Sequence, residues 1–520
     1  MWQGGMLEQD NKEKIREILS LIIESGYQID REAFEFLKEV SNKISLNSLI
    51  KRVIEELSSL PEKPLLITRV ILERKVNEVG LIEKNTTLST KTAGITGKAS
   101  SEPYAKSVEA DLRVISDPTN EISATGSLED CIEYFRSRFR KISRIIRSRV
   151  DAKDAGSIND ALKAPENSRV KIICMISEKR ETKRGILFRI EDLESQATVL
   201  VPSENMEVYS KAQCVPLDQV VCINVIHGKN DLLVAEDIIF PDVPLKKPNK
   251  SPIPVCAVLL SDLHVGSKMF MEREFRYFIR WLRGDVGGSN LRELASRVKY
   301  LLIAGDIVDG IGIYPQQFEE LEIRDIYKQY EYVAKILEEV PDYIEIVIIP
   351  GNHDATRRAL PQPAITREYA ESLYELGRIH FLGDPSVISL HGVSILLSHG
   401  RSLDDVISAT PRMSFQAPDE AMKLLLQCRH LAPIYGMRTL IASEKVDHLV
   451  IEHIPDIFHA GHVHMMKYSM YRGILVVNSG AWQRQTEYQR EMGHIPNPGI
   501  IPVVNLQTLD IFPVDFTSAI

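Results

Sequence analysis

The sequence predicts a multidomain protein in which an α/β domain over 253–520 follows a small β-barrel over 165–243 and an N-terminal helical module over 1–75. Three observations predict this organisation. At 520 residues the chain exceeds the usual size of a single hydrophobic core. Short alternating strands separated by turn residues fill its middle. In the C-terminal half, apolar runs end in polar motifs, which is typical of buried strands that carry a site at their carboxyl ends.

Residues 1–75 have helical periodicity. Within 11–24 the apolar residues fall on one face, and Asp30 is a candidate N-cap for a second helix. We interpret these faces as the core of a small bundle. Docking of a partner is the alternative, and periodicity alone does not separate the two.

Two segments connect this module to the barrel. Residues 84–109 are rich in Thr, Ser, Gly and Lys without an apolar period, which predicts a flexible linker. Residues 127–150 predict a basic amphipathic helix with an apolar stripe through Phe135 and Phe139. Its basic residues are Arg136, Arg138, Arg140, Lys141, Arg144, Arg147 and Arg149. We interpret them as a solvated face, with contact to nucleic acid or to an acidic partner as the alternative.

Residues 165–243 predict a five-stranded, OB-like barrel. Such barrels often bind single strands through exposed aromatic side chains on which bases stack. Here only Phe188, Tyr209 and Phe240 are available. We therefore favour a structural role, bracing the following domain and contacting a partner, over direct binding of a strand.

The C-terminal domain carries five polar motifs in a fixed order, each after an apolar strand-like run. They are DLH at 262–264, GDIVD at 305–309, GNHD at 351–354, SHG at 398–400 and GHVH at 461–464. Carboxylate, amide and imidazole side chains in this mixture suit a pair of divalent metals about 3.5–4 Å apart that share one anionic ligand. The motifs predict a two-metal site for phosphoester hydrolysis.

Each motif residue receives a role in this scheme. Asp306 is expected to bridge the metals. One metal takes Asp262, His264 and His464, and the other takes Asn352, His399 and His462. A water acidified by both metals is the expected nucleophile. His353 is left free to protonate the leaving oxygen, with Asp309 orienting its ring, so these two are the candidate catalytic residues.

Further residues near the motifs are candidates for holding a nucleic acid. Arg357, Arg358, Arg401 and Arg484 are expected to face phosphates, and Trp482 and Tyr488 to stack a terminal base. The alternative for each arginine is a surface ion pair.

The motifs resemble the calcineurin-like metallophosphoesterase pattern D-x-H, G-D-x-x-D, G-N-H-[DE], H, G-H-x-H. Longer sequence segments over roughly residues 110–520 are similar to the small-subunit family of archaeal family D DNA polymerases. These segments are GDIVDGIGIYP at 305–315, PGNHDATRRALPQPA at 350–364, HGRSLDD at 399–405, RHLAPIYG at 429–436 and NSGAWQRQTEYQ at 478–489.

This resemblance implies a four-layer β-sandwich with flanking helices and a Mn²⁺-dependent 3′–5′ proofreading exonuclease, with Mg²⁺, Fe or Zn as other metals. It also implies a heteromer with a large catalytic polymerase subunit, DNA as a ligand, and access to a sliding clamp through that complex. Eukaryotic relatives have lost ligands, so an inactive scaffold subunit is one alternative. A metal-dependent small-molecule phosphodiesterase is another.

Charge and hydropathy limit these expectations. The formal net charge of −9 weakens a stand-alone DNA-binding protein and is compatible with a metallonuclease subunit whose partner supplies the basic surface. No apolar run approaches the length of a membrane span, and the first residues lack the apolar core of a signal peptide. We therefore expect a soluble protein in the cytoplasm.

Overall fold

The computed structural model describes residues 102–491 and 493–517, with scattered positions between 22 and 72. The chain forms two compact units, 1–100 and 101–520. In the first unit, the described residues include helical positions such as Ile22, Ala33 and Val53, and β1 (Gln28–Ile29) pairs in parallel with β2 (Leu66–Ile67). Most of the helices expected there, and the linker up to residue 101, lie outside the described residues.

The second unit contains two six-stranded sheets. The first has the order β12 (Ile379–Phe381), β11 (Glu345–Ile349), β10 (Val298–Ala304), β9 (Cys256–Leu260), β18 (Ile500–Asn505), β19 (Ile511–Asp515). The second has the order β16 (Lys467–Tyr471), β17 (Ile474–Asn478), β15 (Ile457–Ala460), β14 (Val393–Leu397), β13 (Ser386–Leu390), β3 (Leu112–Ser116). Strands β9 to β12 are parallel, as are β14, β15 and β17.

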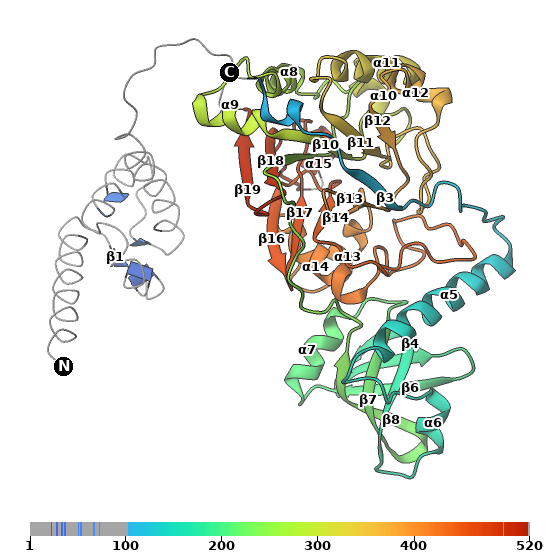
Figure 1. The fold of residues 1–520 in the computed structure, drawn as a ribbon. Helices are drawn as coiled ribbons and strands as arrows, with labels where there is room; N and C mark the ends of the chain where they lie inside the picture. Colours follow the sequence, from blue (N-terminus) through green and yellow to red (C-terminus); the bar gives the residue numbers. More distant parts are fainter. Residues whose placement is uncertain are drawn as a thin grey trace, which may run out of the picture. The chain divides into compact units, whose positions relative to one another are not determined.

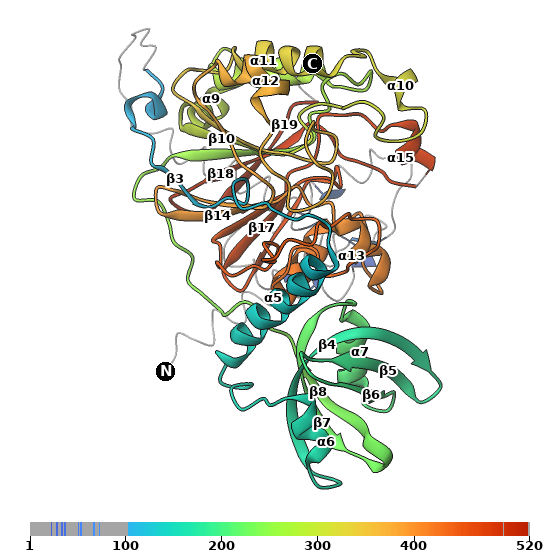
Figure 2. The same cartoon turned by 90° about the vertical axis from the view of Figure 1, so that its right-hand side faces the viewer.

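The two sheets pack face to face, and helices cover their outer faces (Figures 1 and 2). Alternate residues of β9 face opposite sides of the first sheet. Ala257 and Leu259 lie in the core between the sheets, while Val258 and Leu260 contact the outer helices. The helices on the first sheet are α8 (Glu272–Leu282), α9 (Ser289–Ser296), α11 (Ile326–Leu337) and α12 (Arg367–Tyr374). Those on the second are α13 (Leu403–Ala409) and α14 (Pro418–Cys428). Two short helices, α10 (Gln317–Glu320) and α15 (Glu487–Glu491), lie in loops.

A closed barrel of five strands forms a separate core, so the mixed α/β class and the barrel expected from the sequence are confirmed. Its order is β4 (Arg169–Thr182), β5 (Gly185–Glu191), β6 (Gln196–Pro202), β8 (Leu232–Ile239), β7 (Val220–His227), with α6 (Ile158–Lys163), α7 (Met206–Cys214) and the 3₁₀ turn η2 (Lys229–Asp231) beside them. Phe188 is buried in this core, and Tyr209 and Phe240 pack against it. All three aromatic side chains therefore contribute to the barrel core.

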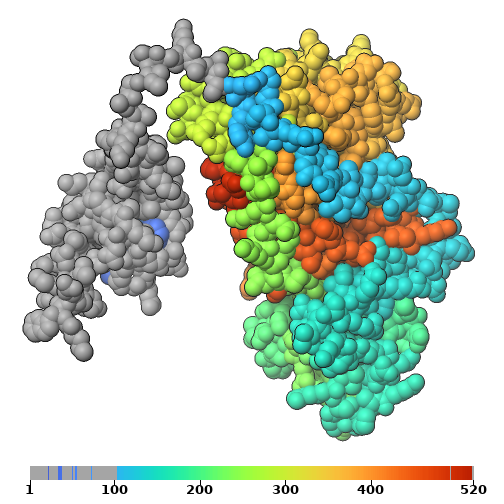
Figure 3. All heavy atoms as spheres, in the orientation of Figure 1, coloured from blue at the N-terminus to red at the C-terminus, as the bar shows by residue number. Residues whose placement is uncertain are grey.

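Residues 102–116 differ from the linker expected up to 109. Tyr104–Ser107 form the 3₁₀ turn η1 with Ala105 buried, and β3 then joins the edge of the second sheet beside β13. The space-filling view shows this segment, in blue, lying on the surface of the sandwich (Figure 3). A strand that precedes the barrel in sequence therefore completes the domain that follows the barrel.

The basic helix α5 (Leu128–Arg147) lies between the barrel and the sandwich (Figure 1). The interpretation of its basic residues as a solvated face is wrong for Arg138, which is 0% exposed. Its guanidinium forms an ion pair with Asp447 at 2.9 Å and donates to the backbone oxygens of Pro433 and Asp218 at 2.7 and 3.2 Å. Arg138 thereby ties α5 to the sandwich and to the loop that leads into β7.

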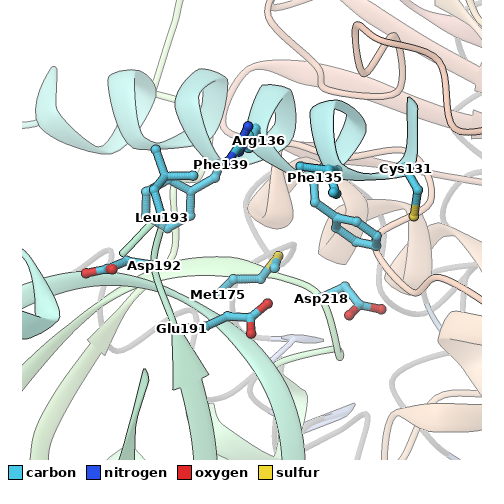
Figure 4. A pocket seen from close by; sticks show the side chains of 10 residues that line it. Cys131, Phe135, Arg136, Phe139, Met175, Glu191, Asp192, Leu193 and Asp218 are labelled. Carbon is cyan, nitrogen blue, oxygen red and sulfur yellow. The ribbon is translucent and has the colours of Figure 1, made fainter. Parts of the chain in front are cut away.

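A pocket of about 320 Å³ lies between α5 and the barrel (Figure 4). Phe135 and Phe139 of α5 face Met175 of β4, and Glu191 and Asp218 line the barrel side. The helix therefore covers this side of the barrel incompletely. Among the residues that the structure describes, no helix is long and apolar enough to cross a membrane.

Replacing Arg138 by Met should strongly destabilise the second unit. The substitution leaves Asp447 buried without its guanidinium partner, which typically costs about 3–5 kcal/mol. The matched control is Arg140→Met on the same helix, where the side chain is 60% exposed and its carboxylate partner Glu133 is 3.6 Å away. Urea unfolding followed by fluorescence should show a much lower midpoint for Arg138→Met only. Equal midpoints for both variants would contradict the role given to Arg138.

Candidate metal centre

The five motifs lie in loops at the carboxyl ends of β9, β10 and β11 in the first sheet and of β14 and β15 in the second. Packing of the two sheets brings these ends together. Several motif residues have left-handed backbone conformations, which are uncommon outside glycine and are tolerated best by Asn, Asp and His. They are Asp262 (φ 53°), His264 (φ 50°), Asp306 (φ 53°), His462 (φ 69°) and His464 (φ 55°). The loops thus turn sharply where ligands are needed.

Glycines in the motifs permit very close approach between loops. A Cβ atom on Gly351 would lie 2.1 Å from Oδ1 of Asp306, and one on Gly461 would lie 2.5 Å from Oδ2 of Asp262. Any side chain at either position would displace a carboxylate. The glycines of the GNH and GHVH motifs therefore serve the placement of Asp306 and Asp262.

The predicted ligands meet in overlapping clusters whose ligand atoms lie within 4.8 Å of one another. One cluster contains Asp262, His264 and His464, and another contains Asp306, His399 and His462. Nε2 of His399 also lies 3.1 Å from Oδ1 of Asn352. A further cluster joins His264, Asp306 and His353, so Asp306 belongs to two groups. The His/Asp clusters can hold metal ions.

The imidazole rings are fixed from outside and present a free nitrogen to the centre. Nδ1 of His399 contacts the backbone oxygen of Ala304 at 2.8 Å, and Nδ1 of His464 contacts Gln489 at 3.0 Å. The Nε2 atoms of His264 and His464 then face each other at 3.1 Å. Imidazole nitrogens gathered in this way beside carboxylates form a donor set that suits divalent cations such as Mn²⁺, Fe²⁺ or Zn²⁺.

Buried carboxylates and imidazole rings in the centre shift one another's pKa values. Burial by itself would raise the pKa of Asp262, but the neighbouring His464 and His264 hold it well below its usual range. Burial opposes protonation of His264 and His399, yet hydrogen bonds and charges from Asp262, Asp306 and Asp309 raise the pKa of both rings to about 10. Metal ions bind only deprotonated imidazole, so protonation of these rings competes with metal binding.

Asp309 acts differently from the expectation. Its buried carboxylate contacts Nδ1 of His264 at 3.0 Å, whereas its distance to Nδ1 of His353 is 4.0 Å. Nδ1 of His353 instead contacts the backbone oxygen of Asp309 at 2.7 Å. Asp309 thus orients the ligand His264 through its side chain and His353 through its main chain. Gln317 and Gln483 each donate to its carboxylate at 3.0 Å.

Other positioning residues were missed by the motif analysis. Asp354 accepts hydrogen bonds from the backbone nitrogens of Asp306 and Gly351, both at 2.8 Å, and so joins two motif loops. Asp404 lies 3.2 Å from Nε2 of His462. The Asp at the end of GNHD and the Asp pair in HGRSLDD were visible in the sequence. Their contacts join loops from different strands, which no local pattern reveals.

One expected nucleic-acid contact is wrong, and two of the candidate arginines have partners within the protein. Trp482 is 0% exposed and packs edge-on against Phe275 at 4.8 Å, so it cannot stack on a base. The Arg357 guanidinium pairs with Glu444 at 2.7 Å and donates to the backbone oxygen of Pro361, so it is occupied within the protein. Arg484 forms an ion pair with Glu274 at 2.7 Å, which is the surface alternative.

Arg358 and Arg401 remain candidates for the expected role. The exposed Arg358 donates to the backbone oxygen of Gly312 at 3.1 Å. Arg401 donates to the backbone oxygen of Arg358 at 2.9 Å. Burial lowers the pKa of Arg401, and the nearby Asp306 works against that shift. Two linked arginines therefore lie beside the metal centre.

Replacing Gly351 by Ala should weaken metal binding by at least about tenfold, the scale on which supporting residues act at metal sites. The added Cβ would clash with the Asp306 carboxylate. Gly288→Ala is the matched control, because no atom lies within 4 Å of a Cβ there. Calorimetric titration of both variants with Mn²⁺ checks this. Unchanged affinity in Gly351→Ala would contradict the close approach.

Comparison with known proteins places the chain in a family. Residues 257–469 match the family model for the B-subunits of DNA polymerases alpha and epsilon. A DNA polymerase II small subunit from Archaeoglobus fulgidus is 41% identical over 494 residues, covering 92% of this chain and 93% of that protein. Small subunits from Methanothermobacter thermautotrophicus (43% identical, covering 76% and 81%) and Pyrococcus furiosus (42% identical, covering 74% and 63%) are also similar.

A solved archaeal phosphodiesterase is 14% identical, with half of this chain and 99% of that chain covered, but its TM-score of 0.26 supports no argument. The curated relatives confirm the family expected from these sequence segments. This chain belongs to the family of DNA polymerase II small subunits.

Proposed function

We propose that this chain is a 3′–5′ exonuclease that hydrolyses DNA phosphodiester bonds with two metal ions, as the small subunit of a heteromeric replicative DNA polymerase. The observation that carries this proposal is the intact donor set, in which imidazole nitrogens and carboxylate oxygens converge in three overlapping clusters, two of which contain Asp306. Family membership supports DNA as the substrate. The retained ligands favour an enzyme over an inactive scaffold.

In this proposal, residues 253–520 form a calcineurin-like metallophosphoesterase domain with Mn²⁺ as the working metal. Asp306 would be shared, with Asp262, His264 and His464 on one side and Asn352, His399 and His462 on the other. When bound, the two ions would supply Lewis-acid activation of a water nucleophile and neutralise charge on the phosphate. The protein's contribution is to hold these ligands in fixed rotamers.

His353 is the proposed proton donor to the leaving oxygen. Its Nδ1 is fixed by the backbone oxygen of Asp309, and its Nε2 lies 4.0 Å from Oδ2 of Asp306, on the side of the centre. Burial lowers the pKa of His353, which works against the protonated form. An anionic phosphate beside the ring would raise that pKa again, so donation would be coupled to substrate binding. Arg358 and Arg401 would hold neighbouring phosphates.

A larger polymerase subunit is the proposed partner, since the relatives are small subunits. The chain's net charge of −9 fits a division of labour in which the partner supplies most of the basic duplex-binding surface. The small subunit would then receive a DNA end from the complex rather than capture DNA alone.

The Asp306→Asn and His353→Ala variants should fail in different ways. Asp306→Asn should abolish Mn²⁺-dependent cleavage and lower metal content, because it weakens a shared anionic ligand. His353→Ala should lower cleavage by about 10²–10⁴-fold while both metals stay bound, as expected for loss of an acid. His380→Ala, a surface histidine paired with Glu345, is the control. Metal analysis decides, and equal metal loss in both site variants would make His353 a ligand.

Mismatched 3′ ends should be degraded faster than paired ones. Unpairing a terminal base costs a few kcal/mol, and a mismatched end that is already frayed needs less of this free energy to reach the buried centre. Incubation of 5′-labelled primers with the protein and Mn²⁺ should give a ladder of products that shortens from the 3′ end. Release of mononucleotides from the 5′ end, or internal cuts that ignore the terminus, would contradict the proposed polarity.

A further inference from the structure

Tyr314, in the loop before α10, and Tyr488, in α15, stack beside the proposed proton donor. The ring centroids of Tyr314 and Tyr488 are 5.6 Å apart with an interplanar angle of 24°. The Tyr314 ring lies 6.3 Å from the His353 ring. Tyr488 is 49% exposed, so ring surface beyond its contact with Tyr314 is open to solvent. An aromatic surface therefore lies at the edge of the metal centre.

Both loops are anchored to the residues that build that centre. Gln317, which follows Tyr314 in the same loop, donates to the backbone oxygen of Asp309 at 2.7 Å and accepts from the backbone nitrogen of Ile313 at 2.9 Å. Gln489, directly after Tyr488, contacts Nδ1 of His464 at 3.0 Å. The Tyr314 hydroxyl donates to Glu320 at 2.8 Å. The stacked pair is thus held in a defined position relative to the ligands.

A cation lies beside the same loop. Arg358 is exposed and donates to the backbone oxygen of Gly312, two residues before Tyr314. The exposed Tyr488 ring stacks on Tyr314, and the Arg358 guanidinium is bonded to the loop that carries Tyr314. An aromatic ring and a guanidinium match the two recognisable parts of a nucleotide, a flat base and a phosphate. Neither Tyr488 nor Arg358 is needed to hold metal.

We propose that the Tyr314–Tyr488 pair is a stacking site for the terminal base of a single-stranded DNA end, with Arg358 on an adjacent phosphate. This inference rests on the proposed function and adds how that site selects its substrate. Stacking accepts every base, because each has a π face, but it requires a base that has left the duplex. Recognition of the end is therefore independent of sequence and sensitive to pairing. The competing explanation is that the two rings only pin α15 to the neighbouring loop.

Binding of short single-stranded oligonucleotides by the full-length protein separates these explanations. The probes carry a phosphorothioate at the last linkage to resist cleavage, and end either in a natural 3′ nucleotide or in an abasic one. Wild-type protein should bind the natural end about tenfold more tightly, the scale of one base stacked on an aromatic side chain. Tyr488→Leu should remove this preference, and Tyr488→Phe, which keeps the ring, should retain it.

The proposal is overturned if wild-type protein binds both ends equally, or if Tyr488→Leu still prefers the natural end. A loop that is merely loosened would weaken binding of both probes by the same factor, which also overturns it. Because binding is measured without cleavage, a preference that depends on Tyr488 supports the stacking site even in a chain that fails to hydrolyse DNA. Failure of the proposed function appears separately, as absent Mn²⁺-dependent cleavage.

Discussion

The position of the Asp306 carboxylate is the constraint on which the site depends. Its Oδ1 accepts from the backbone nitrogen of His353 at 2.8 Å, and its Oδ2 lies 3.2 Å from Nε2 of His399. Asp354 fixes its backbone nitrogen, and Gly351 leaves room for its side chain. This buried carboxylate belongs to two clusters of potential ligands, so small displacements would disturb both. The sharp backbone turns at the motif residues are tolerable because the surrounding loops hold them in place.

The fold surrounds Asp306 with other candidate ligands because it brings strand ends from two sheets together. One sheet contributes Asp262, Asp306 and Asn352, while the other contributes His399 and the GHVH histidines. Neither sheet alone supplies a complete donor set. The barrel and α5 lie away from these loops and are joined to the sandwich through the buried Arg138–Asp447 pair. The candidate metal centre and the barrel therefore occupy different parts of the second unit.

The sequence predicted what is local and missed what joins distant segments. Strand-like runs, the barrel and the converging motifs follow from periodicity and residue type. The edge strand β3 escaped prediction because its partner β13 lies far along the chain. Arg138 was placed at the surface because charged side chains are mostly exposed, and Trp482 was expected to stack on a base because it lies near the ligand motifs. Tertiary partners bury both side chains. The carboxylate of Asp309 was assigned to His353, since spacing alone does not distinguish that ring from His264.

The most direct test of the two-metal account is the anomalous scattering of manganese in crystals of this protein grown with Mn²⁺. We expect two anomalous peaks about 3.5–4 Å apart, with Asp306 touching both. One peak should be bound by Asp262, His264 and His464, and the other by Asn352, His399 and His462. A single peak, or two peaks that do not share Asp306, would contradict the account.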